Sequence, residues 1–299
     1  MNHHHGLDDH DRGLSHDLAV MERLVRRRQM LRWAAGAGAM ALLAGCGDDG
    51  TSGGSDTTTS SSTATPTPTP TPTATSTASP SACIADPTET NGPYPADGTN
   101  ASSGSTSNVL TASGVVRGDI RASFIGSTSS APGVTLTLTL TLVNANASCA
   151  PLSGYAIYIW CCDANGQYSL YSAPAESWLR GVQVTDGNGQ VTFTMVFPGC
   201  YSGRWPHIHF EVYSSISAAT SGRNAALISQ IAMPQAVCDT VYADTATYPA
   251  SATNLARITI ASDNVFGDNT SAQIARMTAS VTGSNAAGYV ATNTIGIAV

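Results

Sequence analysis

The chain has 299 residues, of which 42% are hydrophobic and only 11% are charged. This length corresponds to one or two domains, and the apolar content is sufficient for a buried core. Lysine is absent, and from Cys46 onward seven arginines face fifteen acidic residues. This negative balance leaves no basic patch and argues against a nucleic-acid-binding protein.

The first segment has the features of an export signal. Residues 23–46 place an arginine cluster before a short apolar run that is too short to span a membrane. Arg27 and Arg28 match a twin-arginine pattern, and the small residues before Cys46 resemble a lipobox. We therefore expect residues 1–45 to be a signal and Cys46 to carry lipid. The alternative is a cytoplasmic amphipathic helix.

Residues 46–82 form the next compositional block. They consist almost wholly of Gly, Ser, Thr, Ala, Asp and Pro, with an alternating Thr-Pro run. Such a segment cannot bury a core and is expected to stay extended. It predicts a stalk that holds residues 83–299 away from a membrane or cell wall.

Residues 83–299 show the patterns of a β-protein. Residues 134–143, VTLTLTLTLV, alternate strictly with a period of two, and a DGNG turn at 186–189 precedes another alternating run. Strands are expected at 134–143, 155–160, 190–196, 207–213, 256–260 and within 279–297, and a short helix or irregular structure at 222–246. These short strands predict an all-β antiparallel sandwich with short irregular or helical insertions.

The cysteine count is consistent with export. If Cys46 takes lipid, six cysteines remain: Cys83, Cys149, Cys161, Cys162, Cys200 and Cys238. An even number in an exported chain predicts disulfides, although the pairing stays open. The neighbours Cys161 and Cys162 point to opposite faces of a strand, so we expect them to take different partners. A thiolate metal site is the alternative, but no Cys-x-x-Cys spacing supports it.

Two histidines carry the first indication of chemistry. His207 and His209 are the only histidines after Cys46, and they lie two apart in a predicted strand, so both rings face the same side. Paired imidazoles are natural metal ligands. The alternative is two polar residues on an exposed strand face. Glu211, two residues further along, is an alternative third ligand.

Two tyrosines follow turns near this strand. Tyr201 comes directly after a Pro-Gly-Cys segment, and Tyr168 follows a turn at 163–167. A phenol loses its proton near pH 10, and a strong Lewis acid such as iron(III) displaces that proton at neutral pH. No cluster of carboxylates accompanies the histidines, which argues against an iron(II) site with two histidines and one carboxylate.

These segments resemble the intradiol ring-cleavage dioxygenases, the family of catechol and protocatechuate dioxygenases. The shared pattern comprises Trp160 with Gly166-Gln167-Tyr168, then Pro198-Gly199-Cys200-Tyr201, Arg204 and His207-Ile208-His209. A TNGPY segment ending at Tyr94 and a Ser-Gln pair ending at Gln230 extend the resemblance over roughly residues 86–235.

The resemblance implies an enzyme with Fe(3+) as cofactor. Tyr168, Tyr201, His207 and His209 would bind the iron, and Tyr201 would leave it when a catechol binds. Arg204 would stabilise negative charge developing on the ring, with Gln230 positioning that arginine. Tyr94 and Trp160 would line the substrate pocket. The substrates would be a small aromatic diol and dioxygen, with cleavage between the two hydroxylated carbons.

The chain also departs from the family. The loop from Tyr201 to His207 is shorter than in the well-known soluble enzymes, and no N-terminal helical dimerisation region is present. The substrate is therefore undetermined, and a homodimer is an open alternative. The competing hypothesis is a stalk-displayed extracytoplasmic binding module with a structural or inactive metal site. Either protein would meet the membrane only through a lipid on Cys46.

Overall fold

The computed structural model describes residues 83–299 of the chain. The expected signal segment 1–45, the stalk 46–82 and the lipid site at Cys46 lie outside the described residues. Within the part that is described, no helix is long and apolar enough to cross a membrane.

The first sheet is built around the alternating segment predicted from the sequence. β1 (Thr135–Asn144) pairs antiparallel with β5 (Gln190–Val196) and, near its end, with the two-residue β2 (Ala150–Pro151). On its other side β1 pairs in parallel with β9 (Gly288–Ile297), which pairs antiparallel with β8 (Ser280–Ser284). The four leucines of β1 are buried and its threonines are partly exposed, as a half-buried strand requires.

The second sheet carries the predicted histidines. Its order is β4 (Arg180–Val184), β3 (Ala156–Trp160), β6 (His207–Tyr213) and β7 (Leu227–Ala232), and every pair is antiparallel. The register sets Trp160 opposite His209 and His209 opposite Gln230. Residues in one register row share a face, so the sheet itself brings these three side chains together.

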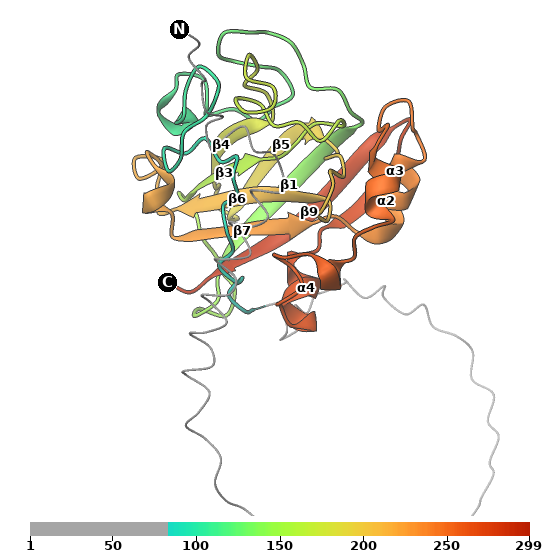
Figure 1. Cartoon of the computed structure of the whole chain (residues 1–299). Coiled ribbons are helices and arrows are strands. Elements are labelled where there is room, and N and C mark those ends of the chain that lie inside the picture. The colour runs from blue at the N-terminus through green and yellow to red at the C-terminus, as the bar shows by residue number, and fades with distance from the viewer. Residues whose placement is uncertain (1–82) are drawn as a thin grey trace, which may run out of the picture. The chain divides into compact units, whose positions relative to one another are not determined.

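The two sheets pack face to face around the main core (Figure 1). Alternate residues of β6, including Ile208 and Phe210, enter this core with the leucines of β1. The opposite face of the second sheet is also buried, under the loops of residues 91–125 and 163–178. These loops cover a second cluster that contains Tyr158, Trp160 and Tyr168. The histidine face is therefore enclosed by loops.

Short helices complete the fold. They are α2 (Gln235–Tyr242), α3 (Ser251–Leu255) and α4 (Ser271–Met277), with 3-10 turns η3 (Val109–Thr111), η4 (Gly222–Asn224) and η5 (Ile260–Ser262). Figure 1 shows α2 and α3 beside the sandwich, next to β9. The N-terminus of α4 is closed by a reciprocal capping box between Thr270 and Gln273.

The all-β sandwich is confirmed, with corrections in detail. The strand expected at 256–260 is wrong, because that segment is a turn after α3 that leads into η5. The region 222–246 contains β7 as well as the expected short helix. The sheet expected to be purely antiparallel contains the parallel β1–β9 pair. Alternation predicts a strand but not the direction of a partner more than 140 residues away.

The cysteines pair less than the sequence predicted. One disulfide joins Cys83 to Cys149. Cys161, Cys162, Cys200 and Cys238 are free and buried, so the expectation that Cys161 and Cys162 form disulfides with different partners is wrong. Burial explains the difference, because each of these four thiols fills apolar core space as a small hydrophobic side chain.

Candidate active site

The histidine pair forms the floor of the site. His207 and His209 project from the loop-covered face of β6, and their Nε2 atoms lie 3.0 Å apart. Both side chains are almost fully buried. His207 Nδ1 lies 2.5 Å from the carbonyl oxygen of Trp205, which makes Nδ1 the protonated nitrogen and leaves the Nε2 lone pair free for other partners.

Trp160 and Gly92 hold the second imidazole. The ring of Trp160 stacks on His209 with centroids 4.7 Å apart and planes 5° from parallel. On another side the TNGPY segment approaches closely, because a Cβ on Gly92 would lie 3.1 Å from His209 Cε1. Gly92 has φ +70°, a conformation that glycine adopts without strain. Trp160 is fully buried and packs against the imidazole.

Two tight turns bring the phenols to the same point. The Asp163 carboxylate accepts N–H bonds from Asn165 and Gln167, which folds the turn that ends at Tyr168. At the top of that turn Gly166 lies against Tyr201, where a Cβ would come within 2.9 Å of the Tyr201 Cβ. The hydroxyl oxygens of Tyr168 and Tyr201 each lie 3.4 Å from His207 Nε2.

The electrostatics of these four groups define what they can bind. Burial raises the pKa of Tyr201 to about 12, and burial together with Tyr201 raises that of Tyr168 well above its usual range. Burial and the Arg204 charge lower the pKa of His207 to about 3, and burial lowers that of His209 well below 6.5. The imidazoles are therefore neutral at physiological pH, and their lone pairs are available.

The donor set fits a hard trivalent cation. His209 Nε2 and the two phenol oxygens lie within 3.0 to 3.4 Å of His207 Nε2, so that two imidazole nitrogens and two phenol oxygens converge. Within residues 83–299, no three His, Cys, Asp or Glu side chains are grouped to hold a metal. Phenolate oxygens with imidazoles suit iron(III), which can displace the phenolic protons.

A buried arginine stands beside the donors. Arg204 Nη1 lies 3.5 Å from His207 Nε2, and Nη2 donates to Gln230 Oε1 at 2.7 Å. Gln230 Nε2 in turn donates to the carbonyl oxygen of Thr90, two residues before Gly92. The register row of the second sheet thus connects the arginine to the TNGPY loop.

Asp263 holds this arginine, and the sequence analysis did not identify it. Its carboxylate oxygen accepts from Arg204 Nε at 3.0 Å, and both side chains are buried. Burial alone would raise the pKa of Asp263, but the Arg204 charge and the Trp205 N–H outweigh burial and hold it below its usual value. Asp263 lies in an irregular turn 54 residues beyond His209. In the sequence, its acidic side chain was the one property that could have indicated a partner for Arg204.

The approach to the donors is aromatic. Tyr94 packs on Tyr168 with ring centroids 4.7 Å apart and on Tyr171 at 5.2 Å. Tyr94 and Tyr201 are partly exposed, whereas Tyr168 is buried.

Glu211, the alternative third ligand, has a structural role instead. Glu211 shares the face of His209, but it accepts a hydrogen bond from the Tyr213 hydroxyl, and burial with Asp97 raises its pKa well above 4.5. A neutral acid held in this way is a poor third ligand. Tyr158 and Trp178 are buried and pack in the two core clusters.

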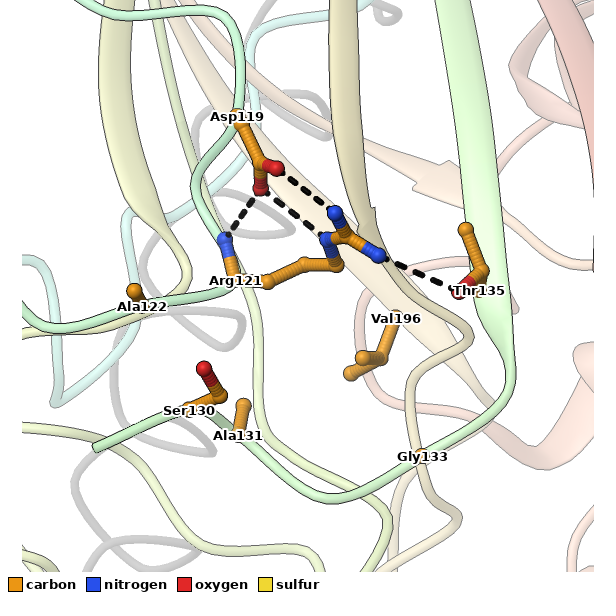
Figure 2. Close-up of a pocket in the computed structure, with 8 residues that line it drawn as sticks. All are labelled: Asp119, Arg121, Ala122, Ser130, Ala131, Gly133, Thr135 and Val196. Atoms are coloured by element: carbon orange, nitrogen blue, oxygen red, sulfur yellow. Dashed lines mark hydrogen bonds and ion pairs between the residues drawn. The ribbon is translucent and has the colours of Figure 1, made fainter.

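A pocket in the described part of the chain lies away from this site. Figure 2 shows a cavity of about 330 Å³ between residues 119–135 and Val196. Its charges are already paired, because Arg121 Nη2 contacts Asp119 Oδ2 at 2.7 Å and Nη1 lies 3.5 Å from the Thr135 hydroxyl. None of the candidate ligands lines it, so it plays no part in the donor set.

Among comparisons with known proteins, the one with solved structures gives matches. No protein-family model and no curated protein matches the sequence. The solved structures that match include an intradiol ring-cleavage dioxygenase from Tetranychus urticae, with 26% identity over 62% of this chain and 87% of that one, at a TM-score of 0.49. The dioxygenase Tetur07g02040 is 24% identical over 72% of this chain and 95% of that one, at a TM-score of 0.53.

A more distant match is 3-chlorocatechol 1,2-dioxygenase from Rhodococcus opacus 1CP. It is 15% identical over 70% of this chain and 71% of that one, at a TM-score of 0.41. Of these three structures, the dioxygenase Tetur07g02040 has a TM-score above 0.5. At 24% identity, the likeness to the second structure shows a common fold.

Proposed function

We propose that this chain is an iron(III)-dependent intradiol dioxygenase that cleaves catechol-type rings between the two hydroxylated carbons. The observation that carries the proposal is the convergence of four donor atoms, from Tyr168, Tyr201, His207 and His209, beside a buried guanidinium. When bound there, iron(III) makes a chelated catecholate reactive toward dioxygen. The protein supplies the binding, the charge and the proton transfers around it.

The two tyrosines have different tasks in this proposal. Tyr168 is buried and packed under Tyr94, so it stays in place as a permanent ligand. Tyr201 is partly exposed as a residue, so we assign to it the role of the ligand that would leave when the diol binds. Its phenolate oxygen would then accept a proton from a substrate hydroxyl.

Arg204 supplies fixed positive charge to the reacting ring. It is buried and held by Asp263 and Gln230, so it needs no reorganisation when negative charge develops on the substrate. Preorganised donors of this kind contribute about 10² to 10³ in rate. The loops over the site also exclude water, which strengthens the interaction.

The aromatic side chains around the donors favour a small, flat aromatic diol. Tyr94 packs on Tyr168 at 4.7 Å and on Tyr171 at 5.2 Å, which forms an aromatic wall, and Gly92 lets the chain approach His209 without a side chain. Aromatic walls pack against an aromatic substrate through offset or edge contacts. We propose catechol-like compounds as the substrate class, with dioxygen as the second substrate.

The proposal places the enzyme outside the cytoplasm. The twin-arginine pattern, the lipobox-like residues before Cys46 and the stalk composition support export and a lipid anchor. The Cys83–Cys149 disulfide is also typical of an oxidising compartment. Fractionation of cells that express the wild type and Cys46→Ser tests this part, and a variant that stays in the membrane fraction contradicts lipidation of that cysteine.

Product analysis tests the proposed reaction. The full-length protein is loaded with iron and given catechol under ¹⁸O₂, and oxygen uptake and product mass are followed. We expect a muconate-type diacid that contains both labelled oxygen atoms. A ring-opened aldehyde product, or no turnover of any catechol-type compound by iron-loaded protein, contradicts the proposal. The second result favours a stalk-displayed binding module.

A further inference from the structure

A second buried arginine lies behind the donor set. Arg180 begins β4 opposite Trp160, and only 1% of its surface is exposed. A buried guanidinium is costly unless its charge and its five N–H groups are satisfied. Within residues 83–299, the hydrogen bonds of the Arg180 guanidinium all go to neutral oxygen atoms rather than to a carboxylate.

All five donor positions of Arg180 are used. Nε donates to the Ser169 hydroxyl at 2.9 Å, and Nη2 donates to the Ser169 carbonyl at 2.8 Å. Nη2 also donates to the Tyr94 carbonyl at 2.9 Å, and Nη1 to the Pro95 carbonyl at 2.9 Å. The fifth bond, from Nη1, goes to the Tyr158 hydroxyl at 3.0 Å. Hydrogen bonds from a charged donor are roughly twice as strong as neutral ones.

These bonds join two segments that matter for the site. Ser169 directly follows the proposed ligand Tyr168, and Tyr94 is the aromatic wall that packs on the Tyr168 ring at 4.7 Å. The two segments are separated by more than 70 residues in the chain and share no strand. Arg180 therefore fixes the backbones of both partners of this ring pair at once.

The ligand segment also needs an external support. Leu170, two residues after Tyr168, has φ +66°, the left-handed region that branched apolar side chains seldom adopt. Such a conformation persists only where surrounding contacts over-determine it. The two Arg180 bonds to Ser169 supply contacts of this kind next to the strained residue.

We propose that Arg180 is a positioning residue that locks the phenol ligand Tyr168 and the substrate-facing Tyr94 into one rigid unit. The inference rests on the proposed dioxygenase function for its effect on turnover. The claim that Arg180 locks the two tyrosine segments together does not depend on that function. Arg180 acts through the two tyrosines, and through them it sets the geometry of the proposed ligand Tyr168 and of the aromatic wall that packs on it.

Arg180→Lys is the main test, because lysine keeps the charge but its single nitrogen cannot reach all of these acceptors. Arg121→Lys is the control. The Arg121 guanidinium pairs with Asp119, and none of its hydrogen bonds in the described chain goes to Arg180 or to either tyrosine segment.

The first readout needs no iron. Hydrogen exchange of the metal-free full-length protein is compared for peptides covering residues 93–96, 168–173 and β1. For Arg180→Lys we expect at least 10-fold faster exchange in the first two segments, with β1 unchanged. Arg121→Lys should leave the exchange of both tyrosine segments at the wild-type rate. Wild-type exchange of these segments in Arg180→Lys overturns the proposal.

The second readout uses the iron-loaded protein. We expect Arg180→Lys to bind iron, to shift the tyrosinate-to-iron absorption band, and to lower kcat/KM by roughly 10- to 100-fold through both kcat and KM. An unchanged band and unchanged constants overturn the proposal, as does an equal effect of Arg121→Lys. If Arg180→Lys does not fold, Ser169→Ala replaces it as the test, because it removes the hydroxyl that accepts from Arg180 Nε. It should shift the absorption band and speed hydrogen exchange in the same direction as expected for Arg180→Lys.

The two proposals fail in different ways. A wild-type protein that forms no tyrosinate-to-iron band and turns over no catechol refutes the dioxygenase function. The exchange experiment on the metal-free protein still decides whether Arg180 locks the two tyrosine segments.

Discussion

The substitution Asp263→Asn tests the support of the proposed catalytic arginine. The Asp263 carboxylate accepts two hydrogen bonds from Arg204, at 3.0 and 3.4 Å. It also accepts the backbone N–H groups of Trp205, Val265 and Phe266, at 2.7 to 3.1 Å. An amide at this position keeps the shape but removes the charge. It also turns one acceptor into a donor that faces other donors.

The expected loss follows from burial. Both side chains of the Asp263–Arg204 pair are at most 1% exposed, so the substitution leaves an uncompensated buried guanidinium. Removing one partner of a buried pair lowers the free energy of unfolding by about 3 to 5 kcal/mol. Because Arg204 also loses its fixed orientation, we expect kcat to fall about 10²-fold.

Urea unfolding at pH 7 measures the stability term. Asp119→Asn is the matched control, because Asp119 pairs with Arg121 at 2.7 Å but both side chains are largely exposed. An exposed pair contributes about 0 to 1 kcal/mol, so the control should change little. A loss below 1 kcal/mol for Asp263→Asn, or equal losses for both variants, refutes the reasoning.

The pH dependence of the same pair has a definite sign. The folded pKa of Asp263 lies below its unfolded value, so its contribution is present above pH 4 and is lost as the pH falls through the lower folded pKa. Asp263→Asn should lack this acid-side loss. The difference in unfolding free energy between wild type and variant should therefore shrink below about pH 4.

Three further changes test separate parts of the account. Gly92→Ala puts a Cβ 3.1 Å from His209 Cε1 at φ +70°, so we expect a loss of about 1 to 2 kcal/mol in urea unfolding and a shifted iron absorption band; an unchanged band contradicts the close approach. Removing the Cys83–Cys149 disulfide, which closes a separation of 66 residues, should lower the unfolding free energy by about 4 kcal/mol at most, and a loss under 1 kcal/mol argues against it. Burial raises the pKa of Asp86 to about 6. The free energy of unfolding of the wild type should therefore fall by about 3 kcal/mol relative to that of Asp86→Asn between pH 4 and 7. A difference between the two proteins that does not change with pH contradicts this burial effect.

The strands with strong alternation could be predicted from the sequence. The period of two in residues 134–143 and 190–196 gave β1 and β5, because a half-buried strand exposes every second residue to the core. The His-x-His spacing likewise placed both imidazoles on one face. The tyrosines were found through the motif and lie within 3.4 Å of His207 Nε2.

Other features depend on contacts that leave no local pattern. Asp263 lies in a turn after a 3-10 helix, and only the folded chain brings it to Arg204, 59 residues away. The short β4 has no clear alternation, and three of its five residues are buried, so it went unrecognised. The segment 256–260 carries β-branched residues, but α3 and its turn override that local preference.

The visible absorption spectrum of the iron-loaded full-length protein tests the central claim most directly. If the proposed iron(III) site is correct, the protein shows a broad tyrosinate-to-iron band that shifts when catechol is added. The band should be lost or strongly altered in Tyr168→Phe and Tyr201→Phe, and kept in the control Tyr289→Phe, whose hydroxyl contacts only Asn285 in the described chain. A protein that stays colourless after iron loading, or a band that survives both ligand substitutions unchanged, contradicts the account.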